Sequence, residues 1–310
     1  MALPESFVER FQAIYPKDAQ ELLKTFDLPK PVSFRINPLK TTVESATERL
    51  KRAGFCLQPV PWYRYAFTVP FEERDGLTRS PLFQEGEIYI QSLSSMLAPL
   101  ALNPQPGETI LDLTAAPGGK SLMMAAQMKN RGWLSVVEPG RDRFFRLKAN
   151  LERGGVTIAH YYMTDGRSVG GKCPAMFDRV MLDAPCSTEA KFKSDTPKTF
   201  TYWSERKIRE MSRLQQRLIV SALKSLKPGG TLLYATCSFA PEENEAIIDR
   251  ILKKDAALAI EPIALPLENL RNGLLQWKKK RFSSEVAHCV RVLPTETMDG
   301  FFLCKLRKLS

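Results

Sequence analysis

The sequence contains few of the residues that build metal sites or disulfide frameworks. Its 310 residues include only two histidines, and its six cysteines form no C-x-x-C pair. Structural zinc sites need clustered Cys and His ligands, and small disulfide-bonded domains need a high density of cysteine. We therefore expect no metal and no disulfides. The widely scattered cysteines are Cys56, Cys173, Cys186, Cys237, Cys289 and Cys304.

Long apolar runs are also missing. No stretch approaches the roughly 18 uncharged apolar residues of a membrane span. The opening MALPESFVERF carries Glu5 and Glu9 in place of the apolar region of a signal peptide. We expect no membrane partner and a cytoplasmic location, and the lack of a coiled-coil pattern makes a monomer the expected oligomeric state.

Acidic residues are outnumbered by basic ones. The chain has 45 Lys and Arg against 34 Asp and Glu, which gives a formal net charge of +11. Basic side chains gain free energy by displacing counterions from phosphates, so this charge favours a polyanionic partner. A basic protein without such a partner would have the same composition.

The chain divides into two regions of different pattern. Residues 1–80 mix helical stretches with the basic extended segment VSFRINPLK, which indicates a small α+β domain. In residues 81–310, strand and helix patterns alternate regularly from about residue 107, which predicts an α/β fold with a doubly wound parallel sheet. The long amphipathic helix KIREMSRLQQRLIVSALKSLKPGG is expected to end at its Pro-Gly-Gly, and CVRVLP with GFFLCKLRK to form an antiparallel hairpin at the sheet edge.

Small and acidic residues follow three successive predicted strands. DLTAAPGGK follows the first, Glu138 the second and Asp165 the third. In a doubly wound sheet the ligand binds beyond the carboxyl ends of the strands, where an acidic residue can accept hydrogen bonds from a ribose. Taken singly, Glu138 could be a charge at a helix start and Asp165 a turn residue. Together they indicate an adenosine-type cofactor, and the absence of G-x-G-x-x-G favours S-adenosylmethionine over NAD.

Two further strand ends carry Asp183-Ala184-Pro185-Cys186 and Thr236-Cys237-Ser238. An isolated cysteine is most often an inert small hydrophobe, but two cysteines and an aspartate beside a methyl donor suit methylation of a pyrimidine at carbon 5. A thiolate that adds to carbon 6 makes carbon 5 nucleophilic. A carboxyl group at the edge of the ring stabilises the charge that develops there, and a second group assists release of the methylated product. These residues alone do not decide which cysteine attacks.

At these motifs the sequence resembles the Nop/Sun (RsmB-like) family of RNA cytosine-C5 methyltransferases. The resemblance runs from SFRINPLK and YIQSLSSMLAPLALNPQPGE through LDLTAAPGGKS, TDGR, MLDAPCS and LKPGGTLLYATCSFAPEENE to DGFFLCKLRK. It implies a Rossmann-like class I methyltransferase fold that acts on rRNA or tRNA, with Cys237 as nucleophile and Cys186 assisting release. It also implies a methyl-donor site lined by Thr114, Ala115, Ala116, Pro117, Gly118, Gly119, Lys120, Glu138, Asp165 and Asp183, with Asp183 also reaching the cytosine.

The chain departs from the family pattern in two places. Thr114 stands where the family usually has a cysteine, and the side chain at this position does no chemistry in this scheme. Residues 187–192 replace the Gly-rich stretch that usually follows Cys186. That loop should shape the substrate pocket. RNA phosphates are expected to contact exposed cations, with WKKKRF favoured because aromatics interleave with charge. The candidates are Arg35, Lys40, Lys191, Lys193, Lys198, Lys278, Lys279, Lys280 and Arg281.

Two alternatives use the same residues differently. A DNA cytosine-C5 methyltransferase would attack through the Pro-Cys cysteine, Cys186, but the Glu-Asn-Val and Gln-x-Arg-x-Arg motifs of such enzymes are absent. A catalytically silent RNA-binding assembly factor would retain the fold without turnover. The presence of both cysteines and Asp183 argues against this second alternative.

Overall fold

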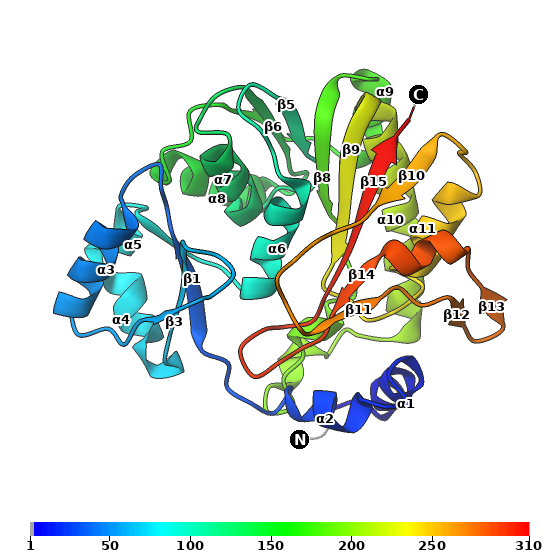
Figure 1. Ribbon diagram of the computed structural model, residues 1–310, viewed down its shortest axis with the longest axis horizontal. Coiled ribbons are helices and arrows are strands. Elements are labelled where there is room, and N and C mark those ends of the chain that lie inside the picture. The colour runs from blue at the N-terminus through cyan, green and yellow to red at the C-terminus, as the bar shows by residue number, and fades with distance from the viewer. Residues whose placement is uncertain (1–2, 310) are drawn as a thin grey trace.

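A computed structural model of the chain describes residues 3–309. Figure 1 shows a large sheet with helices on both faces, beside a smaller sheet formed by N-terminal segments. Among residues 3–309, no helix is both long and apolar enough to span a bilayer.

The large sheet has nine strands in the order β11-β14-β15-β9-β8-β5-β6-β7, and β10 also pairs with β15. The strands from β7 to β9 are parallel, and β15 is antiparallel to β9 and to β14. This confirms the doubly wound α/β sheet and the antiparallel pair, although β11 lies outside that pair. The strands are β5 (Thr109–Asp112), β6 (Trp133–Val137), β7 (Ala159–Tyr162), β8 (Phe177–Asp183), β9 (Leu226–Thr236), β10 (Leu258–Glu261), β11 (Leu270–Asn272), β14 (Val290–Val292) and β15 (Phe301–Lys308).

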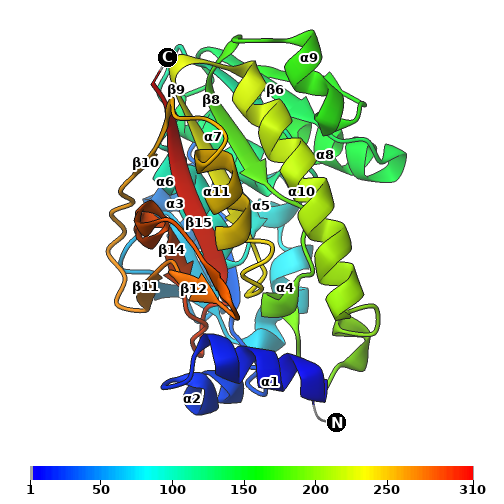
Figure 2. The same cartoon turned by 90° about the vertical axis from the view of Figure 1, so that its right-hand side faces the viewer.

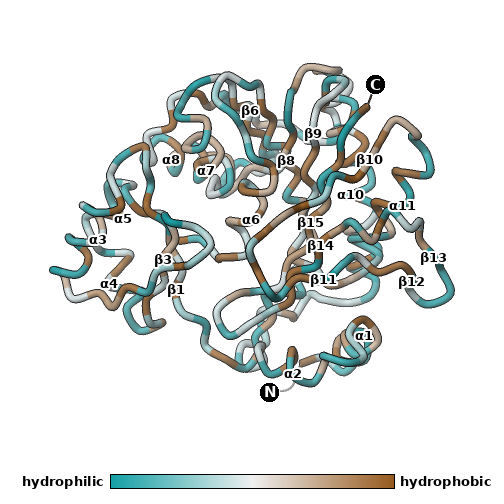
Figure 3. Tube along the Cα trace, in the orientation of Figure 1, coloured by the Kyte–Doolittle hydropathy of each residue, from teal (hydrophilic) through white to brown (hydrophobic). Residues whose placement is uncertain are grey.

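Apolar residues fill both faces of this sheet, as its covering helices require. Along β9, Leu233 and Ala235 pack in one cluster while Leu232 and Tyr234 pack in the other, because successive side chains point to opposite faces. Figure 3 shows hydrophobic residues concentrated in the central strands. One face is covered by α6 (Leu93–Leu102), α7 (Gly119–Gln127) and α8 (Arg141–Arg153), and the other by α9 (Val169–Lys172), α10 (Glu205–Ser225) and α11 (Glu245–Leu252).

The long helix ends earlier than the sequence pattern indicates. α10 stops at Ser225, and β9 already begins at Leu226. The predicted helix end at Pro-Gly-Gly is therefore wrong, because Pro228, Gly229 and Gly230 lie at the start of the strand. Gly229 has a φ of +73°, which allows the chain to bend there before it enters the buried part of β9.

The smaller sheet has the order β2-β3-β1-β4 and packs against short helices over its own apolar cluster. Its last strand lies beyond residue 80 and pairs with β1, so this sheet extends past the boundary expected from composition. The division into domains 1–80 and 81–310 remains a proposal. The elements are β1 (Val32–Ile36), α3 (Val43–Arg52), β2 (Gln58–Pro59), β3 (Ala66–Val69), α4 (Arg74–Arg79), α5 (Pro81–Gln84) and β4 (Ile88–Ile90).

The first two helices do not pack on this sheet. α1 (Glu5–Ile14) and α2 (Ala19–Lys24) join an aromatic cluster with residues that follow β8 and β9. Figure 2 shows both helices at one end of the large sheet. The remaining elements are a small hairpin of β12 (Gln276–Trp277) and β13 (Lys280–Arg281) and the 3-10 helices η1 (Phe71–Glu73), η2 (Gly166–Ser168), η3 (Glu189–Lys191), η4 (Pro197–Thr199) and η5 (Ser284–His288).

Candidate active site

A cavity of about 590 Å³ lies beyond the carboxyl ends of the parallel strands. It brings together predicted residues that are far apart in the sequence, because neighbouring parallel strands end at the same edge. Its apolar walls include Leu113, Pro139 and Leu218. The predicted residues that line it are Thr114, Ala116, Glu138, Asp165, Asp183, Cys186 and Cys237.

The remaining residues of the Gly-rich loop shape the cavity without lining it. The Ala115 N–H donates to the Val137 carbonyl at 2.9 Å, which attaches the loop to β6. Gly118, with a φ of +108°, precedes α7. A Cβ at Gly119 would lie 2.8 Å from the Tyr89 ring, so only glycine fits there. Pro117, linked to Ala116 by a cis peptide bond, completes the turn.

Glu138 and Asp165 stand at the ends of β6 and β7 with different surroundings. Glu138 is 2% exposed, and its Oε1 accepts from the Gly140 N–H at 2.9 Å. The carboxylate of Asp165 accepts from Arg167 Nε at 2.8 Å and caps η2, and this contact with Arg167 lowers the pKa of Asp165. Both carboxylates have an arginine partner, since Arg143 lies 3.4 Å from Glu138 Oε2, but the Glu138 side chain is enclosed whereas that of Asp165 is 43% exposed.

Asp183 ends β8 with its carboxylate against Lys120. Asp183 Oδ2 accepts from Lys120 Nζ at 2.6 Å, and Lys120 also donates to Ser95 Oγ at 2.6 Å. The Thr114 hydroxyl donates to the Asp183 carbonyl at 2.9 Å. The Asp183 side chain is 32% exposed and the Lys120 side chain 12%. The carboxylate therefore has its charge balanced and still has surface with which to contact a ligand.

The two predicted cysteines face each other. Asp183 of β8 lies opposite Ala235 of β9, so the loops that follow these strands leave the same edge, and the Sγ atoms of Cys186 and Cys237 are 3.2 Å apart. The hydrogen bond from Cys186 lowers the pKa of Cys237 against the effect of burial, and the charges of Lys191 and Lys120 act in the same direction. The same contact, together with burial, raises the pKa of Cys186. The pair thus favours a thiolate on Cys237 and a thiol on Cys186.

The comparison with known families matches nearly all of this sequence. The family described as 16S rRNA methyltransferase RsmB/F matches residues 99–307. The chain belongs to the RsmB/F methyltransferase family. The N-terminal domain of 16S rRNA methyltransferase RsmF matches residues 3–93 of this RsmB/F chain. The resemblance that the motifs indicate is therefore confirmed.

Curated relatives of the RsmB/F chain align along almost its whole length. It is 37% identical to a tRNA (cytosine(49)-C(5))-methyltransferase of Pyrococcus abyssi, over 98% of this chain and 96% of that protein. It is 36% identical to the 25S rRNA (cytosine-C(5))-methyltransferase nop2 of Schizosaccharomyces pombe, over 97% of this chain and 50% of that protein. It is 35% identical to ribosomal RNA small subunit methyltransferase F of Vibrio campbellii, over 99% of this chain and 64% of that protein.

Solved structures show the same fold. A methyltransferase homolog from Pyrococcus horikoshii superposes with a TM-score of 0.85 at 33% identity, covering 99% of this chain and 96% of that one. NSun6 from Pyrococcus horikoshii, solved with SFG, has a TM-score of 0.85 at 21% identity, covering 100% of this chain and 99% of that one. The class I methyltransferase fold of the RsmB/F chain is confirmed.

Two buried carboxyl groups support the cysteine loops of the RsmB/F chain, and the sequence analysis missed both. Glu189 Oε2 accepts from the N–H groups of Phe239 and Ala240 at 2.8 and 2.9 Å. Glu243 Oε2 accepts from the Ser187 N–H at 3.0 Å, and both glutamates contact Ser238 Oγ. Burial raises the pKa of both, that of Glu243 to about 7. Glu243 lies in the acidic run PEENE, a pattern that a helix start would also produce.

One predicted RNA contact in the RsmB/F chain is wrong. Arg35 is fully buried, and it donates to Gln91 Oε1 and to the Gly119 carbonyl, both at 3.0 Å. Because side chains alternate between the two faces of β1, the Arg35 side chain points toward α7, where a phosphate cannot reach it. The other predicted cations are exposed and remain predictions, namely Lys40, Lys191, Lys193, Lys198, Lys278, Lys279, Lys280 and Arg281.

The reason for favouring WKKKRF is also not supported by the structure. Trp277 donates through Nε1 to Glu242 at 2.9 Å with the Arg10 guanidinium over its ring, and Phe282 is 8% exposed. Both rings pack inward because the β12–β13 hairpin lies against α11 and α1. Trp277 remains only partly exposed, so the stretch offers charge and little aromatic surface for stacking.

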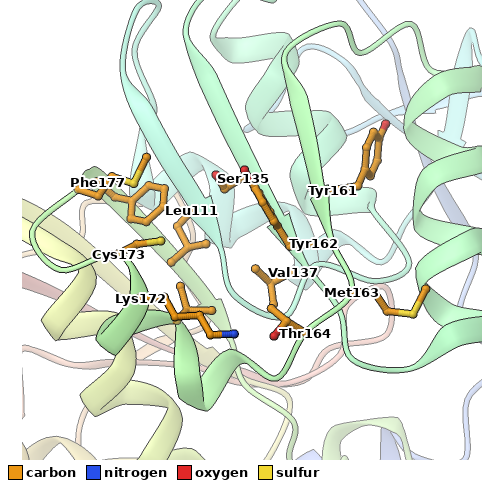
Figure 4. Close-up of a pocket in the computed structure, with 12 residues that line it drawn as sticks. Leu111, Ser135, Val137, Tyr161, Tyr162, Met163, Thr164, Lys172, Cys173 and Phe177 are labelled. Atoms are coloured by element: carbon orange, nitrogen blue, oxygen red, sulfur yellow. The ribbon is translucent and has the colours of Figure 1, made fainter.

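A second cavity, of about 380 Å³, lies beside β6 and β7 of the RsmB/F chain and contains none of the predicted site residues. Figure 4 shows its mainly apolar lining, with Phe177, Leu111 and Val137 near Cys173. It is separate from the cavity that holds Asp183 and the paired thiols.

Proposed function

We propose that the chain methylates carbon 5 of a cytosine in rRNA or tRNA through a covalent adduct with Cys237. Its relatives are named as methyltransferases that act on carbon 5 of cytosine in RNA. The observation that supports the covalent route is the pair of thiols 3.2 Å apart in the cavity that also contains Asp183. A cytoplasmic location and a monomeric state remain predictions from the sequence.

The cavity residues fit S-adenosylmethionine. Glu138 would accept hydrogen bonds from the ribose, while Leu113, Pro139 and Leu218 would contact the adenine, because the cavity has apolar walls with an acceptor at one side. When bound, this cofactor supplies an electrophilic methyl group. The carboxylate of Asp183 lines the same cavity as Cys237, where it can attract the positive sulfonium.

The chain's residues would activate the cytosine in a balanced sequence of steps. The Cys237 thiolate forms a bond to carbon 6, and the electron pair of the 5,6 double bond shifts so that carbon 5 can take the methyl group. The Asp183 carboxylate would accept a hydrogen bond from the exocyclic amino group of the cytosine, and the Lys120 ammonium beside it would stabilise the negative charge that develops on the ring. A base then removes the proton from carbon 5, the double bond re-forms and the Cys237 sulfur leaves. The neighbouring Cys186 assists this release.

The test uses wild-type protein, Cys237→Ala and Cys186→Ala on total cellular RNA with radiolabelled methyl donor. Cys56→Ala is the matched control, because that cysteine is exposed and lies outside the cavity. Cys237→Ala should transfer no methyl group and form no adduct. Cys186→Ala should accumulate a covalent RNA–protein complex on denaturing gels, because addition proceeds and release is impaired.

The other outcomes have distinct meanings. An adduct that requires Cys186 would reverse the two roles and match the chemistry of DNA cytosine methyltransferases. No methyl transfer by wild type, together with RNA binding that Cys237→Ala leaves intact, would instead indicate a silent RNA-binding factor. The labelled RNA species identifies the substrate.

A further inference from the structure

A cleft with charged residues in its lining lies at the contact between the N-terminal sheet and the large sheet. Its volume is about 310 Å³. One wall comes from the start of β1 and the end of β4, and the other from the loops that lead into η4 and into β15. Figure 1 shows the loop before β15 approaching the start of β1, where Lys30 lies 3.7 Å from Asp299. The cleft therefore lies where two separate parts of the chain meet.

The charges that line this cleft are unbalanced. Its cationic lining residues are Lys30, Arg74 and Lys193, and its single acidic one is Asp299. A fourth cation, Lys191, also binds Asp299, so one carboxylate serves Lys191 and Lys30, the latter at 3.7 Å. An excess of positive charge in a cleft raises the local concentration of anions.

Lys30 is a partly buried cation of this cleft and is affected by the excess of positive charge. Its side chain is only 20% exposed, and it donates to the Thr25 carbonyl at 2.9 Å. Burial lowers the pKa of Lys30, Asp299 opposes this, and Lys191 and Lys193 lower it further. A second anion in the cleft would relieve this repulsion among the lysines.

The cleft also presents an aromatic surface. The Phe71 ring is 46% exposed, and Lys193 Nζ lies 5.7 Å from its centroid. Grooves for single-stranded nucleic acid combine cations that follow the backbone with rings on which bases stack. WKKKRF has little aromatic surface of this kind, whereas this cleft has an exposed ring beside its cations.

Lys191 connects the cleft to the reacting thiol. Its Nζ donates to Asp299 and, at 3.3 Å, to Ser92 Oγ, and both of these residues line the cleft. The preceding Ala190 N–H donates to the Cys237 carbonyl at 3.0 Å. A strand whose base reaches Cys237 would thus pass Lys191 and bring an adjoining nucleotide to the cleft.

We propose that this cleft binds the phosphodiester of a nucleotide next to the target cytidine, with Lys30, Arg74 and Lys193 contacting the phosphate and Phe71 stacking on its base. The proposal rests on the proposed function and adds a backbone-binding subsite to it. The substrate it fits is single-stranded, because a base pair would prevent stacking on Phe71.

The test compares Lys193→Gln with Lys254→Gln, an exposed lysine that lies outside the cleft and is not among the predicted RNA contacts. Binding of single-stranded oligocytidylate is measured by fluorescence anisotropy between 50 and 200 mM salt. Lys193→Gln should make the slope of log K against log salt less negative by about 0.7, the value for one phosphate contact to a single strand. With the RNA that wild type methylates, its KM should rise roughly tenfold at unchanged kcat.

Lys30→Gln should also make the salt slope less negative and raise KM, provided that the variant folds. If Lys30→Gln does not fold, the Lys193→Gln variant still tests the subsite, because Lys193 is exposed. A slope and KM for Lys193→Gln equal to those of Lys254→Gln would overturn the subsite while leaving the methyltransferase intact. If wild type methylates no RNA, the proposed function fails, and the oligocytidylate slope still decides whether the cleft binds phosphate.

Discussion

The Glu243 carboxyl group lies directly beneath both cysteine loops. It accepts from Ser187, the residue after Cys186, and from Gln215 Nε2 at 2.7 Å, and it contacts Ser238, the residue after Cys237. Burial raises its pKa to about 7, with the nearby charge of Glu189 adding to the effect. Near neutral pH this carboxyl group is therefore close to half protonated while it positions both thiols.

The Glu243→Gln variant tests whether Glu243 titrates near neutral pH. A carboxyl group whose folded pKa is raised stabilises the fold fully below its unfolded pKa of 4.5 and loses that contribution as pH rises to about 7. The loss amounts to roughly 3 kcal/mol in the free energy of unfolding. Glu243→Gln, an uncharged mimic of the protonated form, should flatten the fall in stability between pH 5 and pH 8, measured by urea unfolding.

The adjacent Glu242→Gln is the control. Although burial opposes it, the hydrogen bond from Arg10 lowers the pKa of Glu242, so this group stabilises the fold above its unfolded pKa and the contribution is lost as pH falls. Glu242→Gln should therefore lose stability at pH 8. An unaltered pH profile in Glu243→Gln would show that Glu243 is not the group that titrates.

At the scale of an element, α1 supports the loop that follows Cys186. Phe7 of α1 lies 5.0 Å from the Phe192 ring, and Phe11 lies 5.0 Å from the Phe239 ring. Phe192 ends the segment that replaces the family's Gly-rich stretch, and Phe239 follows the Cys237 loop. The helix therefore packs on both segments that position the thiols.

Phe7→Ala should create a cavity in this cluster. Loss of a buried phenylalanine side chain costs roughly 3–5 kcal/mol, and the loosened loop should also lower kcat. Glu9→Ala, on the exposed side of α1, should change stability by less than about 0.5 kcal/mol. Both are measured by urea unfolding and by methyl transfer, and equal values for the two variants would show that α1 does not support the loop.

At the scale of the whole molecule, buried side chains of the N-terminal sheet connect it to the methyltransferase fold. Arg35 donates to the carbonyl of Gly119 at the start of α7, and Asn37 Nδ2 donates to the Gly154 carbonyl at 2.8 Å, just after α8. At the opposite end of the sheet, the buried Arg291 forms a bidentate pair with Glu245 and donates to the Tyr15 hydroxyl at 3.0 Å. These polar contacts fix the N-terminal segments in position over the site.

Arg35→Lys keeps the positive charge but cannot reproduce both hydrogen bonds of the guanidinium. It should lose roughly 1–3 kcal/mol of stability, the value of hydrogen bonds to a charged group, in urea unfolding. The salt slope of oligocytidylate binding should stay unchanged, because Arg35 is buried. Lys40→Ala, an exposed cation near the same strand, is the stability control. A reduced slope in Arg35→Lys would contradict the structural position of Arg35.

The fold and the grouping of the reactive residues were predictable because their signals are local. Apolar runs bounded by turn residues mark the parallel strands of the large sheet, and parallel strands end at one edge, so Asp183, Cys186 and Cys237 were expected to lie near one another. The residues that modulate them were not predictable in this way. Glu189 and Glu243 appear in the sequence as ordinary charged residues, and only their burial against the cysteine loops distinguishes them.

The sequence by itself determined the doubly wound α/β fold of the large sheet and the residue types at its strand ends, since periodicity and short motifs carry that information. Tertiary structure decided the charge environment of each group. Lys120, 63 residues from Asp183, balances that carboxylate, and Arg35 points into the protein while Lys193 points into a cleft. The physical reason is that solvation and Coulomb interactions depend on which residues meet in space, and these residues meet only in the folded chain.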